Sequence, residues 1–209
     1  MNNFDPIEQK VILASSSVYR RQLLSKLGID FEYDAPSIDE TPLPTESAED
    51  LVLRLALQKA QSVAMRHPTD FIIGSDQVAV HPSGIVGKPK DHNQAVKQLL
   101  EVSGSKVKLY TGLVLLNAKT GEYQPAVIPF NVYFRELDQT VIEAYLELEK
   151  PYDCAGSLKA EGLGIWLIEK FDGDDLNALI GLPLIQLVSM LTNWGYPVFG
   201  TTDNRAIDA

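Results

Sequence analysis

Serine hydroxyls and guanidinium groups stand together where the first apolar run of the chain ends, in the stretch ASSSVYRR. The apolar run over 11–14 predicts a buried strand, and the run over 17–27 predicts an amphipathic helix. Cations are disfavoured at a helix start, so Arg20 and Arg21 make sense there if an anion docks on the free N–H groups. The stretch therefore indicates a phosphate site. The alternative is that Ser17 only caps the helix and that both arginines are solvated.

Three carboxylates could take part in chemistry on such a ligand. Asp39 and Glu40 lie in a proline-rich loop that contains SIDET, and Asp76 interrupts the apolar strand FIIGSDQVAV. A carboxylate within an apolar strand is costly to bury unless it is paired or binds a metal. The alternatives are that the loop acids are ordinary surface charge and that Asp76 bonds only to backbone.

Two lysines and one glutamate complete the set of candidates. Lys59 falls in ALQKA on a predicted helix, and Lys88 falls in GKP, where the proline favours an extended backbone and fixes the direction of the lysine. Glu161 lies in CAGSLKAEGLG, whose three glycines would let the backbone approach a ligand closely. Surface lysines, and a glycine-rich connector with a solvent-facing glutamate, are the alternatives.

The elements that must position these residues alternate between helix and strand. Apolar periodicity, capping residues and turn residues set their limits. Hairpins among the strands predict an α/β fold with a central mixed sheet, rather than an all-parallel one, flanked by helices. Further strands are predicted over 31–34 and 70–80, in a hairpin over 106–137 that turns at 120–121, and over 164–171; further helices are predicted over 47–66, 91–102, 138–148 and 182–195.

Composition and charge exclude several classes of protein. The chain has 209 residues, 45% of them hydrophobic, which is enough for one domain with a sizeable core, or for one core with an appended lobe. A net charge of −10 without a long basic tract argues against a nucleic-acid binder. The lack of an apolar run of about 18 residues predicts no membrane helix, and a single cysteine with a polar start predicts a cytoplasmic location. We expect a flexible lead over 1–9, one domain over 10–199 and a disordered tail over 200–209.

Seven segments in order give the chain a resemblance to the Maf family of nucleoside triphosphate pyrophosphatases. They are ASSSVYRR, SIDET, ALQKA, GSDQV, GKP, YTGL and CAGSLKAEGLG, and they extend over roughly residues 10 to 198. Within the family the chain is most similar to the branch that acts on 7-methyl-GTP, because it carries Tyr19, Gln77 and Glu161. The branch that prefers pyrimidines typically has arginine, threonine and glutamine at these positions. Tyr19 stands where the 7-methyl-GTP branch often has tryptophan, so an aromatic ring is kept.

The resemblance implies a fold akin to the inosine triphosphate pyrophosphatases, with two lobes and a nucleotide in the cleft between them. It implies hydrolysis of a nucleoside triphosphate to the monophosphate and diphosphate, a divalent metal cation (Mg²⁺ or Mn²⁺) and a homodimer. By position, Asp76 is the expected general base and Glu40 the expected partner of the metal or the water, so both are expected metal ligands. The residues expected to hold the phosphates are Ser15, Arg20, Lys59 and Lys88, and those expected to bind the base are Tyr19, Gln77 and Glu161.

The chemistry agrees with the roles that the resemblance implies. Breaking the anhydride between the α- and β-phosphates needs an activated water and neutralised charge on the leaving diphosphate. Asp and Glu oxygens with one or two Mg²⁺ or Mn²⁺ ions suit the first need. Arg20, Lys59 and Lys88 suit the second, and the two lysines are counted among the expected catalytic residues.

The base end of the predicted site leaves alternatives open. An aromatic face attracts the cationic 7-methylguanine ring, and the Glu161 carboxylate can accept from its N–H donors while repelling the carbonyls of uracil or thymine. On periodicity alone, however, Tyr19 joins Leu23 and Leu27 in the core of its helix. The alternative functions are a house-cleaning pyrophosphatase of UTP, dTTP or modified pyrimidine nucleotides, and a non-catalytic regulator of septum formation. The full set of charged candidates favours an enzyme.

Overall fold

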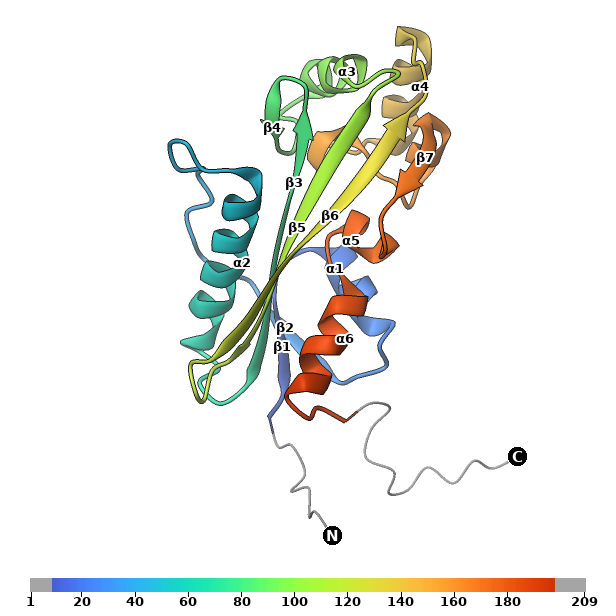
Figure 1. Ribbon diagram of the computed structural model, residues 1–209. Coiled ribbons are helices and arrows are strands. Elements are labelled where there is room, and N and C mark those ends of the chain that lie inside the picture. The colour runs from blue at the N-terminus through green and yellow to red at the C-terminus, as the bar shows by residue number, and fades with distance from the viewer. Residues whose placement is uncertain (1–8, 198–209) are drawn as a thin grey trace, which may run out of the picture.

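One long twisted sheet runs the length of the molecule and carries helices on both faces (Figure 1). The computed structural model describes residues 9–197 of the chain. The strand order is β2-β1-β3-β5-β6-β7, with β4 paired to the end of β3. β1 pairs parallel with β2 and β3, whereas the other neighbours pair antiparallel. The strands are β1 (Val11–Ala14), β2 (Phe31–Asp34), β3 (Phe71–His81), β4 (Gly84–Val86), β5 (Lys106–Asn117), β6 (Tyr123–Phe134) and β7 (Ile168–Asp172).

The helices lie on both faces and at the upper end of the sheet. α2 covers one face, α1, α5 and α6 lie against the other, and α3 and α4 close the upper end in the view of Figure 1. Ser17, Ser47, Asp91 and Asp138 each cap a helix by accepting a hydrogen bond from a backbone N–H three residues on. The helices are α1 (Val18–Ser25), α2 (Ala48–Ala64), α3 (His92–Glu101), α4 (Gln139–Glu149), α5 (Leu176–Ile180) and α6 (Leu184–Asn193).

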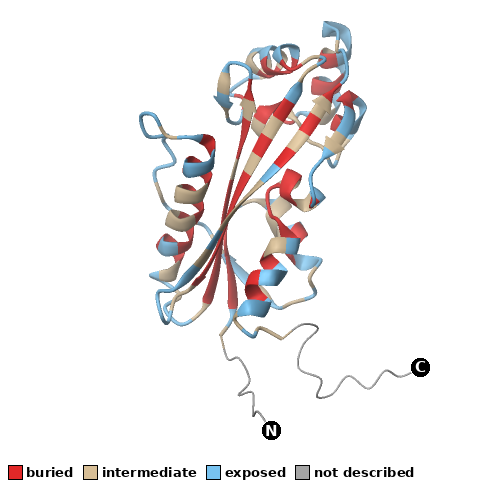
Figure 2. Cartoon of the chain, in the orientation of Figure 1, coloured by how far each residue is buried: buried red, intermediate tan, exposed pale blue. Residues whose placement is uncertain are grey.

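Strand β1 is buried on both faces, as Figure 2 shows for the centre of the sheet. Val11 and Leu13 belong to a core with buried residues of α1 and α6, whereas Ile12 and Ala14 belong to a core with α2. Alternate residues of a strand point to opposite faces, so a strand covered on both sides has a continuous apolar sequence. A third core joins the upper ends of β3, β5 and β6 to α3 and α4. The predicted mixed sheet flanked by helices is therefore confirmed.

Two glycines let α2 lie close to the sheet. A Cβ atom at Gly74 of β3 would collide with the Ala56 carbonyl oxygen, and one at Gly112 of β5 would collide with the Val52 carbonyl oxygen. Side chains at these two positions would push the helix away. Their absence brings the polar positions of α2 within reach of β3, which is where the site forms.

Three short stretches differ from the sequence-based expectation. The stretch 164–171 is predicted as one strand, but Leu163–Leu167 forms a 3-10 helix and β7 begins only after it. The Lys159 carbonyl accepts hydrogen bonds from the N–H groups of Gly162 and Gly164, and this turn curls the apolar run. β4 and α5 were not predicted, because 3 and 5 residues are too few to show a periodicity.

The predicted lead over 1–9 and tail over 200–209 lie outside the described residues, except for Gln9. Its side-chain amide donates to the Thr69 carbonyl at 2.9 Å. The division into lead, domain and tail therefore stays a prediction. Within residues 9–197, no helix has the length and apolar character needed to cross a membrane.

Candidate active site

Lys59 on α2 stands between two carboxylates. Its Nζ atom lies 2.6 Å from Oδ1 of Asp76 on β3 and 3.0 Å from Oε1 of Glu40 in the loop before α2. Lys59 and Asp76 are 5% and 6% exposed, whereas the Glu40 side chain is 57% exposed. Charged groups tolerate such burial when they are paired. The structure thus brings together three charged candidates that lie on three separate segments of the sequence.

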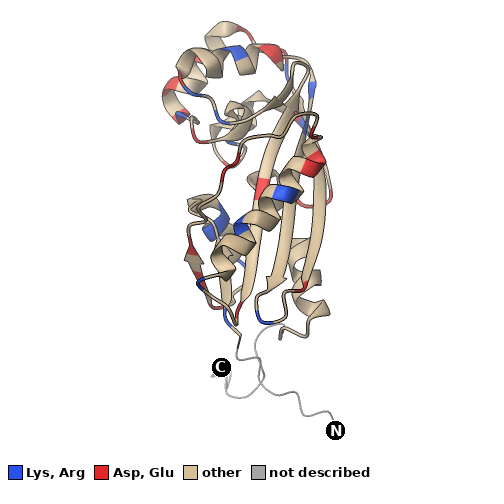
Figure 3. Cartoon of the chain, turned by 90° about the vertical axis from the view of Figure 1, so that its left-hand side faces the viewer, with Lys and Arg blue, Asp and Glu red and all other residues tan. Residues whose placement is uncertain are grey.

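The position of Asp76 follows from the packing of α2. Asp76 pairs across the sheet with Gly112, one of the two glycines over which α2 lies. Figure 3, which looks onto α2, shows residues of both charges on this helix. The alternative that Asp76 bonds only to backbone is wrong, because its carboxylate accepts a hydrogen bond from Lys59.

The start of α1 forms a second side of the site. The Ser15 hydroxyl accepts a hydrogen bond from the Ser17 N–H at 3.1 Å, and the Ser17 hydroxyl accepts one from the Arg20 N–H at 3.4 Å. The Arg20 side chain donates from Nε to the Gly181 carbonyl at 2.9 Å. This contact holds the guanidinium in place and joins two residues that are 161 positions apart in the sequence.

The two arginines of YRR lie in different surroundings. Burial lowers the pKa of Arg20, and the charges of Asp76 and Glu40 oppose that shift. The guanidinium of Arg21 instead lies 4.2 Å from the ring centroid of Tyr33 on β2. Only Arg20 lines the cleft, so the phosphate site with two guanidiniums that the sequence indicated is not formed. Arg21 has an aromatic face as its partner.

A cleft of about 880 Å³ lies in front of these groups. Its size is typical of a small-molecule site. Asp153 also lines it. Every predicted site residue except Glu161 lines this cleft, namely Ser15, Tyr19, Arg20, Glu40, Lys59, Asp76, Gln77 and Lys88.

Glu161 lines a smaller cavity of about 120 Å³ that adjoins the cleft. The two cavities share Tyr19, Arg20, Gln77 and Lys88 in their linings, so they lie side by side. All nine predicted residues therefore border these two adjoining cavities. Their roles toward a ligand stay predictions.

Tyr19 lies in the wall between the two cavities. It is half-buried, and it does not belong to the core that α1 forms, to which Leu23 and Leu24 contribute. The alternative that Tyr19 is part of a core stripe is therefore wrong. The Nζ atom of Lys159 lies 5.8 Å from the centroid of the Tyr19 ring, so this ring already faces one cation.

Gln77 is held by the segment that follows β7. Its Nε2 atom donates to the Ala178 carbonyl at 2.7 Å and lies 3.1 Å from the Leu179 carbonyl and 3.0 Å from Oγ1 of Thr111. An amide nitrogen carries two hydrogens, so these contacts occupy both. The oxygen of the side chain is the group left for a ligand.

The glycines near Glu161 serve the packing of the chain itself. A Cβ atom at Gly162 would lie 2.5 Å from the Glu149 carboxylate, and one at Gly164 would collide with the Lys159 carbonyl. We expected these glycines to let the backbone approach a ligand. In the structure they instead make room for close contacts within the protein. Glu161 itself is exposed.

Two groups of the site had not been singled out from the sequence. Asp153 lines both cavities, and its place directly before CAGS is the signal that points to it. The Gly181 carbonyl accepts hydrogen bonds from Arg20 and, at 2.9 Å, from the Ser75 hydroxyl. A carbonyl has no signature in a sequence, so this anchor could not have been found.

The carboxylates fit a divalent cation that is shared with a phosphate ligand. Within residues 9–197, no cluster of three or more His, Cys, Asp or Glu side chains could hold a metal ion alone. Mg²⁺ commonly uses one or two carboxylates and completes its shell with substrate phosphates and water. Glu40 and Asp76 face one cleft and converge on one ammonium, so both could contribute oxygens there.

Comparison with known proteins places this architecture in a family. The family model "Maf-like protein" matches residues 10–194. A protein of Nitrosococcus oceani named 7-methyl-GTP pyrophosphatase is 53% identical over 95% of this chain and 100% of its own length. One of the same name from Pseudomonas fluorescens is 55% identical over 87% of this chain and 94% of its own. The solved Ham1 protein of Staphylococcus aureus has a TM-score of 0.46 at 12% identity, over 61% of this chain and 73% of its own. The chain belongs to the Maf-like protein family.

Proposed function

We propose that the protein hydrolyses 7-methyl-GTP to 7-methyl-GMP and diphosphate. The observation that carries this proposal is the arrangement of charge in the cleft. Glu40, Lys59 and Asp76 form a tight cluster in the cleft that Arg20 and Tyr19 also line. The names of the relatives, which match nearly the whole chain, support the same activity.

The proposed reaction uses the cluster to attack the α-phosphorus with water. The Asp76 carboxylate accepts the proton that the water loses, while its other oxygen stays bonded to Lys59. The bond between the α-phosphorus and the bridging oxygen breaks, and diphosphate leaves with the electron pair. Arg20 and Lys88 neutralise the charge that develops on the diphosphate, and the third ammonium hydrogen of Lys59 can donate to a phosphate oxygen.

We assign a divalent cation, Mg²⁺ or Mn²⁺, to the same end of the cleft. Glu40 and Asp76 would hold it, together with phosphate oxygens of the substrate. Such a cation supplies Lewis acidity toward the attacking water and charge neutralisation on the phosphates. Glu40, which is the more exposed of the two carboxylates, is the one free to turn toward it.

The base would lie in the smaller cavity. The Tyr19 ring offers an aromatic face to the positive charge of 7-methylguanine. The Glu161 carboxylate offers acceptors to the N1–H and N2–H donors of the base, and the Gln77 oxygen offers another. Uracil and thymine present carbonyl oxygens, which a carboxylate repels. This combination favours 7-methyl-GTP over UTP and dTTP.

A panel of nucleoside triphosphates tests the proposal. We expect kcat/KM, measured by diphosphate release, to be highest for 7-methyl-GTP and lower for GTP, UTP and dTTP. Preference for UTP or dTTP would assign the protein to the pyrimidine class. If the protein turns over none of these nucleotides, a non-catalytic regulatory role, such as one in septum formation, is the alternative function that remains. A homodimer and a cytoplasmic location also remain part of the proposal, and sedimentation and cell fractionation test them.

A further inference from the structure

The loop that carries Glu40 lies as a strap along α2. We define the strap as residues 35–47, between β2 and α2. The Ala35 carbonyl accepts a hydrogen bond from Arg66 at 3.0 Å, and the Ser37 N–H donates to the Ser62 hydroxyl at 3.3 Å. The strap therefore begins at the C-terminal end of α2 and runs back toward its N-terminus. Along this path it passes Lys59.

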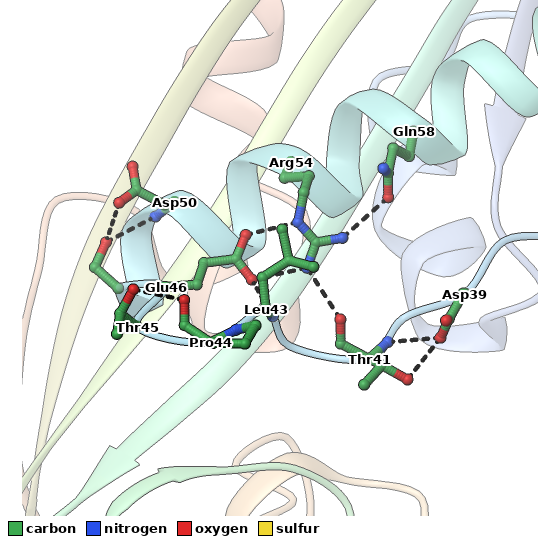
Figure 4. Close-up of polar contacts among 10 residues, drawn as sticks. Asp39, Thr41, Leu43, Pro44, Thr45, Glu46, Asp50, Arg54 and Gln58 are labelled. Atoms are coloured by element: carbon green, nitrogen blue, oxygen red, sulfur yellow. Dashed lines mark hydrogen bonds and ion pairs between the residues drawn. The ribbon is translucent and has the colours of Figure 1, made fainter.

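A single side chain, Arg54, bonds to two residues in the second half of the strap (Figure 4). The guanidinium donates to both carboxylate oxygens of Glu46, from Nε at 2.6 Å and from the terminal nitrogen at 2.8 Å. The same terminal nitrogen donates to the Thr41 carbonyl at 3.2 Å, and the other one donates to Gln58 at 3.1 Å. The Arg54 and Glu46 side chains are only 21% and 8% exposed. A forked, largely desolvated pair of this kind is among the strongest polar contacts in proteins.

The carboxylate of Glu40 has little to hold it except the strap backbone. Its side chain is 57% exposed, and Lys59 is its partner in an ion pair. Thr41, the next residue, is fixed on both sides: its N–H donates to Asp39 at 2.9 Å, and its carbonyl accepts from Arg54. The direction in which Glu40 points therefore depends on a peptide that Arg54 holds.

We propose that Arg54 is a positioning residue for Glu40 in nucleotide hydrolysis. Through Thr41 and Glu46 it fixes the strap against α2, so that the Glu40 carboxylate faces Lys59 and the cleft. Arg54 itself does not line the cleft and so does not bind the phosphates. This inference rests on the proposed function, and it adds a residue that acts through Glu40 and not on the substrate.

Arginine is required at this position for a geometric reason. Glu46, Thr41 and Gln58 lie in three directions around one planar group, and a guanidinium reaches them with its separate N–H donors. The ammonium of a lysine is a point charge and cannot grip a carboxylate with two parallel bonds while it also holds a carbonyl. Arg54→Lys should therefore behave much like Arg54→Gln.

The first arm of the test is a double-mutant cycle. Arg54→Gln should lower kcat for 7-methyl-GTP by about 10- to 100-fold with a smaller change in KM, because a displaced catalytic group costs rate. In a Glu40→Gln background the same change should cost less than about 3-fold, because the two residues act as one unit. Arg66→Gln is the matched control, since Arg66 donates to the Ala35 carbonyl at the far end of the strap and to the Asp34 carboxylate just before it. It should stay near the unmutated rate.

The second arm measures the strap directly by amide hydrogen exchange. Arg54→Gln should speed exchange in residues 39–46 and leave the C-terminal half of α2 unchanged, whereas Arg66→Gln should not affect 39–46. If Arg54→Gln does not fold, Arg54→Lys replaces it, because a lysine keeps the positive charge but cannot hold the Glu46 carboxylate and the Thr41 carbonyl together. Equal losses in both Glu40 backgrounds, or unchanged exchange in 39–46, would overturn the inference. If the unmutated protein cleaves none of the nucleotides, the proposed function fails, and exchange alone decides whether Arg54 orders the segment that carries Glu40.

Discussion

The two ends of the cleft are built in opposite ways. At the phosphate end, Lys59 and Asp76 are buried, lie on α2 and β3, and bond to each other. At the base end, Glu161 is exposed and lies in a turn. It forms no ion pair or side-chain hydrogen bond with the residues that the structure describes. The proposed catalytic groups thus belong to packed elements of the fold, whereas Glu161, the carboxylate proposed to read the base, lies on a segment that can change without disturbing the sheet.

This difference has an energetic consequence. Removing one charge of a buried cluster leaves its partner uncompensated, so changes at the phosphate end affect both stability and turnover. Removing an exposed charge leaves no buried partner uncompensated, so substitutions at exposed positions usually change stability little. Substitutions at the two ends of the cleft should therefore differ in how far they change stability and turnover.

Removal of divalent metal should abolish turnover of every nucleotide. The carboxylates and cations of the phosphate end cannot by themselves supply the Lewis acidity that a bound cation provides. Turnover should vanish in EDTA and return with Mg²⁺ or Mn²⁺. Diphosphate release is the measurement, and full activity in metal-free buffer would contradict the roles given to Glu40 and Asp76.

Asp76→Asn should remove most turnover while the protein stays folded. Loss of a positioned base typically costs about 10²–10⁴-fold in rate. Asparagine keeps the shape of the side chain, and Glu40 still pairs with Lys59. The test compares kcat with the thermal unfolding transition. A folded Asp76→Asn protein with near-normal diphosphate release would rule out Asp76 as the base.

Glu161→Gln should change specificity and leave stability alone. The amide replaces one acceptor oxygen with a donor, so the contacts to the 7-methylguanine N–H groups weaken and uracil is no longer repelled. The ratio of kcat/KM for 7-methyl-GTP over UTP should fall by roughly 5- to 150-fold. Glu147→Gln, at an exposed position on α4, is the control. Equal slowing of all substrates would disprove a base-reading role for Glu161.

The smallest expected effect concerns the pH dependence of the strap. The hydrogen bonds from Arg54 lower the pKa of Glu46 from 4.5 to about 2. The contact therefore stabilises the fold fully above pH 4.5, and the stabilisation is lost as the pH falls through about 2. Glu46→Gln should have a lower melting temperature than the unmutated protein at pH 7, and the gap should narrow toward pH 3. A gap that stays constant with pH would show that Glu46 contributes no charge-dependent stability.

β1 could be predicted from its unbroken apolar run, and the long helices could be predicted from an apolar period and a cap. α2 is an example, since Ser47 marks the start of a helix whose core positions repeat regularly. The run GIWLIEKF could not be assigned correctly in full, because a carbonyl at Lys159 curls its first part. Such a contact depends on tertiary geometry that a local pattern does not contain.

The charged candidates of the site could also be found from the sequence, while the groups that hold them could not. Asp76 stood out as an acid in an apolar strand. Arg54 resembled any charged residue on the solvent side of a helix, and its partners appear only when the strap is seen along α2. The Gly181 anchor of Arg20 likewise depends on a contact between distant parts of the chain.

A competition assay shows which nucleotide the protein hydrolyses when several are present together. The protein is given an equimolar mixture of 7-methyl-GTP, GTP, UTP and dTTP with Mg²⁺, and the nucleotides are separated over time. We predict that 7-methyl-GTP is consumed first, and that 7-methyl-GMP and diphosphate appear in equal amounts. Earlier consumption of UTP or dTTP, or release of free phosphate with a nucleoside diphosphate left behind, would contradict the account.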